Sequence, residues 1–236
     1  MMVLSAGSDG NFDVWTKNIS YHVGGKTMRT IPSLFVKQYH KNNTFTLTRK
    51  VTPGLEHVLT DPNIMPTVQV DGECCAIING KFYKRVKLKL SEVERFKAIM
   101  CQNEPDEATG KIPCWVPLER DNPKDRYFWE AYDLMLRELE ENGAAMYINL
   151  LKHGLYTFEC CGRHFRGNPY SFDEDRLVPH GTIKCEDLGK VSFDSLDKYF
   201  ETHSIEGIVF WKNGVPVAKA KRRDFGWPWV EGRNHD

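Results

Sequence analysis

The sequence predicts a mixed fold of the α+β class in which antiparallel hairpins supply many strands. Apolar and β-branched runs separated by turn residues fill the chain up to Leu90, which is typical of short strands. Asn79-Gly80 and Asn213-Gly214 each lie between two such runs and predict tight hairpins. Apolar residues recur at helical spacing in three later segments, so helices are expected as well.

The first predicted helix follows the first hairpin and leads into a surface segment. Ser91 and Glu94 have the spacing of a capping box, which predicts a short helix with Phe96 and Met100 on its inward side. Residues 103–122 are polar and interrupted by prolines, so we expect a long surface excursion there.

The other two helices and one strand follow from spacing alone. Apolar residues from Phe128 to Leu139 recur at helical intervals and predict a helix that ends near Asn142-Gly143. A similar pattern predicts a helix over Leu196–His203, and the run Leu155–Cys160 predicts a strand between them.

The second hairpin gathers charged side chains on one face. Strict pairing from Asn213-Gly214 places Glu206 opposite Lys221 and Ile208 opposite Lys219. Because side chains alternate along a strand, Glu206, Lys219 and Lys221 would then share a face. Such a group suits a metal-bound phosphate, and a cross-strand surface pair is the alternative interpretation.

Composition places the chain among ordinary globular proteins. It has 236 residues, of which 41% are hydrophobic, and its 32 basic and 32 acidic side chains cancel. No apolar run approaches the ~20 residues of a membrane helix, and no signal peptide is recognised. Adjacent cysteines such as Cys74-Cys75 would point to opposite faces, which favours inert buried thiols over a zinc site. We therefore expect a soluble, intracellular protein, cytoplasmic and without a membrane partner.

The segment Val68-Gln69-Val70-Asp71-Gly72, followed by Arg85, resembles the nucleophile motif of the covalent nucleotidyltransferases. This superfamily includes ATP-dependent ligases and mRNA-capping enzymes, and its motif reads Lys-x-Asp-Gly with an arginine downstream. Later stretches resemble its ribose-binding glutamate strand, its Glu-Gly-hydrophobic motif and its closing Lys-x-Lys motif. In order, these are Tyr156-Thr157-Phe158-Glu159, Ile205-Glu206-Gly207-Ile208-Val209 and Lys219-Ala220-Lys221.

The chain most resembles the small, single-domain ATP-dependent RNA ligases of vertebrates, viruses and microbes. Matching stretches run from about residue 27 to about residue 229. They include Thr30-Ile31-Pro32, Trp115-Val116-Pro117 and Leu177-Val178-Pro179-His180-Gly181. For His180, a loop-stabilising role and a catalytic role are both open.

The resemblance implies a nucleotidyltransferase (ligase adenylation) domain, with two antiparallel sheets, flanking helices and an ATP pocket between the sheets. Few residues follow Arg222, so we expect no OB domain. Residues 1–12 are expected to be a flexible N-terminus and residues 13–236 a single ligase domain that acts as a monomer.

The implied reaction uses ATP and Mg²⁺ (or Mn²⁺). In this family a lysine attacks the α-phosphate of ATP, the adenylate passes to an RNA 5′-phosphate, and a 3′-hydroxyl displaces AMP. The expected partner is therefore RNA with 5′-phosphate and 3′-hydroxyl ends, as in RNA repair. Because a lysine is a nucleophile only when neutral, its pKa must fall well below about 10.4.

By resemblance, each motif residue has an expected role. Lys219 and Lys221 would hold the phosphates and depress the pKa of the nucleophile, so they count as catalytic and as nucleotide-binding. Glu206 would be the metal ligand. Glu159 would bind the ribose, and Arg85 the ribose or a phosphate. The other expected nucleotide-binding residues are Val68, Asp71 and Gly72.

Two features of the nucleophile motif limit this hypothesis. Pairing through the first hairpin puts Arg85 opposite Cys74 and turns position 69 to the other face, so the strand must break around Asp71-Gly72. The nucleophile position also holds Gln69, whose amide cannot form a lysyl-adenylate. Either a Lys-to-Gln change has disabled an RNA ligase, or the chain is a natural pseudoenzyme that binds nucleotide or RNA ends.

Overall fold

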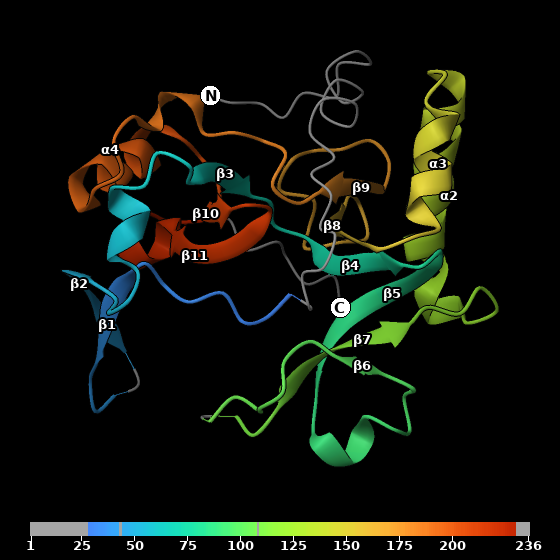
Figure 1. Ribbon diagram of the computed structural model, residues 1–236, viewed down its shortest axis with the longest axis horizontal. Helices are drawn as coiled ribbons and strands as arrows, with labels where there is room; N and C mark the ends of the chain where they lie inside the picture. Colours follow the sequence, from blue (N-terminus) through green and yellow to red (C-terminus); the bar gives the residue numbers. More distant parts are fainter. Residues whose placement is uncertain (1–27, 43, 108, 230–236) are drawn as a thin grey trace. The chain divides into compact units, whose positions relative to one another are not determined.

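The structure, a computed structural model, describes residues 28–42, 44–107 and 109–229, which divide into two compact units (Figure 1). Unit 1 contains residues 31–70 and 181–229, and unit 2 contains residues 28–30 and 71–180, within those described ranges. The predicted flexible stretch 1–12 lies outside the described residues. The single domain expected over 13–236 stays a prediction.

Unit 1 is built on a three-stranded antiparallel sheet in the order β11-β10-β3. Both of its edges are covered by chain segments. Lys219 N–H of β11 donates to Pro32 O at 2.9 Å, and Val68 N–H of β3 donates to Ile183 O at 2.8 Å. The strands are β3 (Met65–Gln69), β10 (Gly207–Lys212) and β11 (Val215–Lys221), and a separate hairpin comprises β1 (Phe35–Tyr39) and β2 (Phe45–Val51).

The helix α4 (Phe193–Thr202) anchors the core of unit 1. Ser192 caps its start by accepting from Ser195 N–H at 3.0 Å. Phe200 of this helix packs 5.1 Å from Phe225 between ring centroids. At its other end the buried Arg222 donates to the carbonyls of Phe200 and His203, which satisfies acceptors that a helix end leaves open. Three 3₁₀ turns complete the unit, at Glu56–Leu59, Glu186–Leu188 and Arg222–Phe225.

Unit 2 is built on a six-stranded antiparallel sheet in the order β6-β7-β5-β4-β8-β9. The two helices α2 (Arg126–Glu141) and α3 (Ala145–Leu151) pack on one face of it, as Figure 1 shows. That face contributes Cys75 and Ile77 of β4 to a buried cluster with Phe128 and Met135 of α2. The strands are β4 (Glu73–Ile78), β5 (Lys81–Leu88), β6 (Ile99–Met100), β7 (Ile112–Pro117), β8 (Leu155–Cys161) and β9 (Arg176–Pro179), and 3₁₀ turns lie at Leu90–Glu92 and Pro123–Asp125.

Several predicted elements are confirmed. β4 and β5 flank Asn79-Gly80, where φ is 48° and 76°, as a tight hairpin with two left-handed residues requires. Helices α2 and α4 and the strand β8 lie where the spacing predicts them. The mixed α and β class with antiparallel sheets is also confirmed. The described residues form three sheets rather than the two expected, because β1 and β2 pair separately.

Two predictions are wrong and one helix was missed. Around Ser91 the chain forms only the 3₁₀ turn Leu90–Glu92, and a helix cannot continue through Lys97, whose φ is 49°. Phe96 and Met100 are exposed and not on an inward side. Residues 103–122 do not form a continuous surface segment, since they include the buried strand β7. The helix α3 has no counterpart in the sequence patterns above. Among the described helices, none has the length and apolar character to cross a bilayer.

Candidate active site

The chain leaves one sheet directly after Gln69 and enters the other at Glu73. β3 ends at Gln69 and β4 begins at Glu73, and the two strands belong to different units, so the predicted strand break is confirmed. The predicted site residues are divided accordingly. Unit 1 holds Val68, Gln69, Glu206, Lys219 and Lys221, and unit 2 holds Asp71, Gly72, Arg85 and Glu159.

Gln69 lies in one row with Gly207 and Lys221 across the three-stranded sheet. β10 pairs Gly207 with Gln69 on one side and with Lys221 on the other. A Cβ built on Gly207 would lie 2.9 Å from Gln69 Oε1 and 2.5 Å from the carbonyl oxygen of Ala220. The glycine therefore leaves the space that the Gln69 side chain occupies. Val68 precedes Gln69, so its side chain points to the opposite face, where it is buried.

Lys221 forms an ion pair with Glu206. Lys221 Nζ lies 2.5 Å from Glu206 Oε1, and both side chains are more than four-fifths buried. Lys219 stands two residues before Lys221 on β11 and projects from the same face. The expected approach of Glu206 to Lys221 is therefore present in unit 1, with Lys219 on the same face of β11 as Lys221.

The predicted register of this hairpin is wrong by one residue. Pairing starts as expected from the Asn213-Gly214 turn, but it shifts between Phe210 and Trp211. Such a bulge places an extra residue in one strand, which a sequence pattern does not reveal. The pairs are Gly207 with Lys221 and Val209 with Lys219, in place of Glu206 with Lys221 and Ile208 with Lys219.

Asp71 and Gly72 connect to the start of β4 in unit 2. The backbone N–H of Asp71 donates to the hydroxyl of Tyr170 at 2.6 Å. A Cβ on Gly72 would lie 2.5 Å from the carbonyl oxygen of Cys160 and 2.7 Å from Cys161 Sγ. The glycine after Asp71 is thus required by close approach to β8. Sequence reasoning did not identify Tyr170 as a partner of Asp71.

Glu159 projects from the face of the six-stranded sheet that lies opposite the helices. Its Cα is paired with that of Cys74, and its Oε1 accepts from His180 Nε2 at 3.0 Å. The other oxygen, Oε2, is buried and has no hydrogen-bond partner among the described residues. Burial raises the pKa of the Cys74 thiol well above its usual value, and the carboxylate of Glu159 raises it further.

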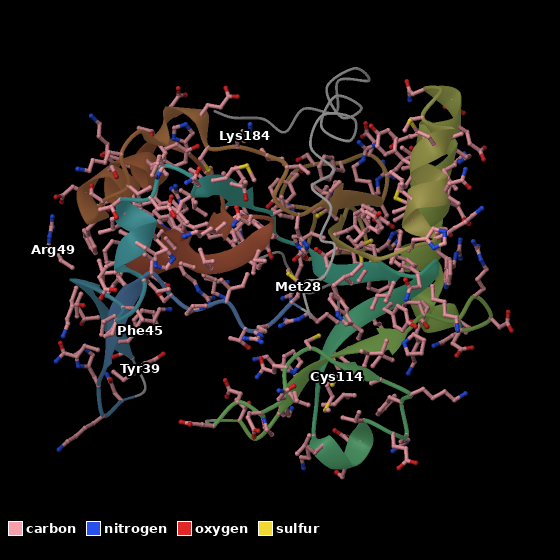
Figure 2. All side chains as sticks on the ribbon, viewed as in Figure 1. Met28, Tyr39, Phe45, Arg49, Cys114 and Lys184 are labelled. Atoms are coloured by element: carbon pink, nitrogen blue, oxygen red, sulfur yellow. The ribbon has the colours of Figure 1, made fainter. Side chains whose placement is uncertain are left out.

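Arg85 lies on β5 of the same sheet, where it is paired with Trp115 of β7. One guanidinium nitrogen donates to the carbonyl oxygen of Met28 at 2.9 Å, and Figure 2 labels Met28. The neighbouring Lys84 points to the opposite face and forms an ion pair with the buried Asp125 at 2.5 Å between Nζ and Oδ1. The basic run in β5 is therefore partly structural.

Comparisons with known proteins agree with one another. A protein-family model described as RNA ligase 1 matches residues 81–235, about two thirds of the chain. The protein named RNA ligase 1 from Pongo abelii is 24% identical over 274 aligned positions, which cover 87% of this chain and 83% of that protein.

Proposed function

The chain belongs to the RNA ligase 1 family, and we propose that its site is that of an ATP-dependent enzyme joining RNA 5′-phosphate and 3′-hydroxyl ends. We propose further that the reaction proceeds through a lysyl-AMP intermediate at position 69, which this chain cannot form because Gln69 stands there. The observation that carries the proposal is the row of Gln69, Gly207 and Lys221, with Glu206 beside it.

A lysine at position 69 would lie over Gly207, in the space that Gln69 now fills. There its neutral amine would attack the α-phosphorus of ATP, forming a P–N bond and losing one proton to the solvent, while pyrophosphate leaves with the electrons of the P–O bond. Lys219 and Lys221 would favour the neutral amine by charge repulsion and would bind phosphate oxygens. An amide nitrogen shares its lone pair with the carbonyl group, so Gln69 stops the reaction at this step.

The remaining residues support nucleotide binding. Glu206 offers hard carboxylate oxygens, which suit Mg²⁺ or Mn²⁺, and the ion would neutralise the triphosphate. Glu206 already pairs with Lys221, so a phosphate or a metal ion would have to replace one partner of that pair. The unpartnered Oε2 of Glu159 fits an acceptor for a ribose hydroxyl. Arg85, Asp71 and Gly72 are proposed as nucleotide contacts by resemblance, as is the backbone at Val68.

A natural pseudoenzyme is the second candidate, and Gln69 itself favours it. Its Oε1 is buried without a hydrogen-bond partner among the described residues, so it can accept a hydrogen bond from a bound ligand. Such a protein would bind nucleotide or RNA ends and catalyse nothing.

The test compares the protein as given with its Gln69→Lys variant. Each is incubated with ATP, Mg²⁺ and a nicked, 5′-phosphorylated RNA. Intact mass then reports a covalent AMP adduct, and a denaturing gel reports joined RNA. We expect both products from Gln69→Lys and neither from the parent. Gln38→Lys is the matched control, because it adds the same charge at an exposed position of unit 1.

The outcomes separate the two candidates. An adduct and sealing only in Gln69→Lys support a ligase disabled at one side chain. Retained ATP binding without either product in Gln69→Lys supports the pseudoenzyme. A parallel titration with GTP distinguishes a ligase from a capping enzyme, since the ligase hypothesis requires a preference for ATP.

A further inference from the structure

Three side chains with different ligand chemistry converge on one face of the six-stranded sheet in unit 2. One ligand atom each from Cys74, Glu159 and His180 lies within 4.8 Å of the other two. Cys74 and Glu159 are paired across β4 and β8, and His180 follows directly after β9. They form a thiol, carboxylate and imidazole group that the spacing of the sequence does not reveal.

The group contains two buried polar atoms that no described residue satisfies. Glu159 Oε2 and His180 Nδ1 both lack a hydrogen-bond partner, although Glu159 Oε1 and His180 Nε2 bond to each other. Buried polar atoms are paired in most native structures, so these two atoms are available to a partner from outside the described residues. The three side chains are not sealed off, because Cys74 is half-buried and Glu159 and His180 keep 15% and 12% exposure.

We propose that Cys74, Glu159 and His180 form a binding site for Zn²⁺. Sulfur, nitrogen and carboxylate oxygen are the ligands that Zn²⁺ takes, and three protein ligands leave a fourth position for water or a substrate atom. A tetrahedral ion with bonds of about 2.0–2.3 Å holds its ligand atoms roughly 3.3–3.7 Å apart. Because the ligand atoms of the three side chains all lie within 4.8 Å of one another, small side-chain movements would bring them to that spacing.

Binding exchanges a proton for the metal. The Cys74 thiol must lose its proton to form the Zn–S bond, and the proton passes to the buffer. His180 must bind as the neutral imidazole, in which one ring nitrogen carries a proton and the other offers its lone pair to the ion. The Glu159–His180 hydrogen bond is lost or rearranged when the ion takes one of its atoms.

Zinc at this site would oppose nucleotide binding. This consequence rests on the proposed function, in which Glu159 binds the ribose of ATP. The same carboxylate cannot serve both ligands fully, so Zn²⁺ and ATP should weaken one another reciprocally.

The experiment titrates the purified 236-residue protein with Co²⁺ and then displaces the Co²⁺ with Zn²⁺, in the absence of nucleotide. Co²⁺ reports a cysteine ligand through thiolate charge-transfer absorption. We expect that absorption in the parent, its loss in Cys74→Ser, and Zn²⁺ binding at least about tenfold weaker in Glu159→Gln and His180→Gln. Cys75→Ser is the matched control, since Cys75 neighbours Cys74 on the strand but points to the other face.

The proposal fails if the parent shows no thiolate absorption, or if Cys74→Ser binds Zn²⁺ as tightly as Cys75→Ser. Thermal unfolding of each variant shows that it is folded, and Glu159→Gln keeps the test decisive should a cysteine variant not fold. A final titration with ATP present separates the two claims. If ATP leaves the affinity for Zn²⁺ unchanged, the proposed antagonism between the two ligands is wrong. If the Gln69→Lys protein binds Zn²⁺ but is inactive, only the proposed ligase function is wrong.

Discussion

At the scale of single residues, Gly207 leaves the space that the side chain at position 69 occupies between the paired strands of unit 1. No other residue type fits at this point of the sheet, because a Cβ would meet the Ala220 carbonyl oxygen at 2.5 Å and the Gln69 side chain at 2.9 Å. Backbone atoms move little, so the side chain at position 69 would have to leave the row. The glycine thus connects the packing of unit 1 with the proposed chemistry.

Gly207→Ala should therefore damage both stability and adenylylation. We expect it to lower the free energy of unfolding by about 1–3 kcal/mol, the usual cost of overpacking, as measured by urea denaturation. In the Gln69→Lys background it should also abolish the AMP adduct seen by mass. Ile208→Val, on the opposite face of β10, is the control and should keep the adduct. An adduct that survives Gly207→Ala would show that position 69 does not need this space.

At the scale of elements, the junction before α2 depends on a buried carboxylate. Asp125 is 1% exposed and accepts from Lys84 Nζ, from Glu119 N–H and from Asn122 Nδ2. It therefore fastens β5 to the start of the helix. Removing one partner of a buried ion pair leaves the other charge uncompensated, which costs far more than losing a solvated pair.

We expect Asp125→Ala to lower the free energy of unfolding by roughly 3–5 kcal/mol. Asp133→Ala provides the comparison, because Asp133 pairs with Arg120 through two hydrogen bonds on the exposed side of the same helix. Its loss should cost less than about 1 kcal/mol. Urea denaturation of the two variants measures both values, and equal losses would contradict the structural role of Asp125.

The elements that sequence predicts well are those with local causes. Asn79-Gly80 specifies its own turn, and the spacing of Phe128 to Leu139 specifies the buried face of α2. The expected helix after Ser91 is absent, and the capping interaction lies two residues earlier than predicted, because the Glu92 carboxylate accepts from the backbone N–H of Lys89. The buried strand β7 was not predicted because Pro113 and Pro117 argue against a central strand. The prolines are tolerated because the neighbouring strand β6 is only two residues long and needs few hydrogen bonds from β7.

In the candidate site, too, the sequence predicts contacts with a local cause and misses those that depend on tertiary packing. Strict pairing from the Asn213-Gly214 turn predicted Glu206 opposite Lys221; the two side chains do form an ion pair, although the backbone partner of Lys221 is Gly207. The bulge beside Phe210 depends on tertiary packing and moved the register by one residue. The contact of His180 with Glu159 joins β8 to the residue that follows its neighbour β9, so it depends on the sheet and not on a local pattern.

At the scale of the whole molecule, a formal charge of zero requires that any RNA contact come from local basic surface. β5 provides one such surface. Lys87 is exposed and lies two residues after Arg85 on β5, so the two side chains share a face. That face of the six-stranded sheet is the one opposite α2 and α3. Lys152 lies at the end of α3, on the helical side of the same unit.

We therefore expect RNA binding that depends steeply on salt and on Lys87. The protein as given is suitable, because Gln69 separates binding from catalysis. Each phosphate contact contributes about 0.9 to the slope of log affinity against log salt on a duplex, since binding releases counterions. Fluorescence anisotropy with nicked RNA should give a slope smaller by about one for Lys87→Gln, and an unchanged slope for Lys152→Gln. Equal slopes for the two variants would mean that the open face of this sheet does not contact RNA, and that Lys87 is only a solvated strand residue.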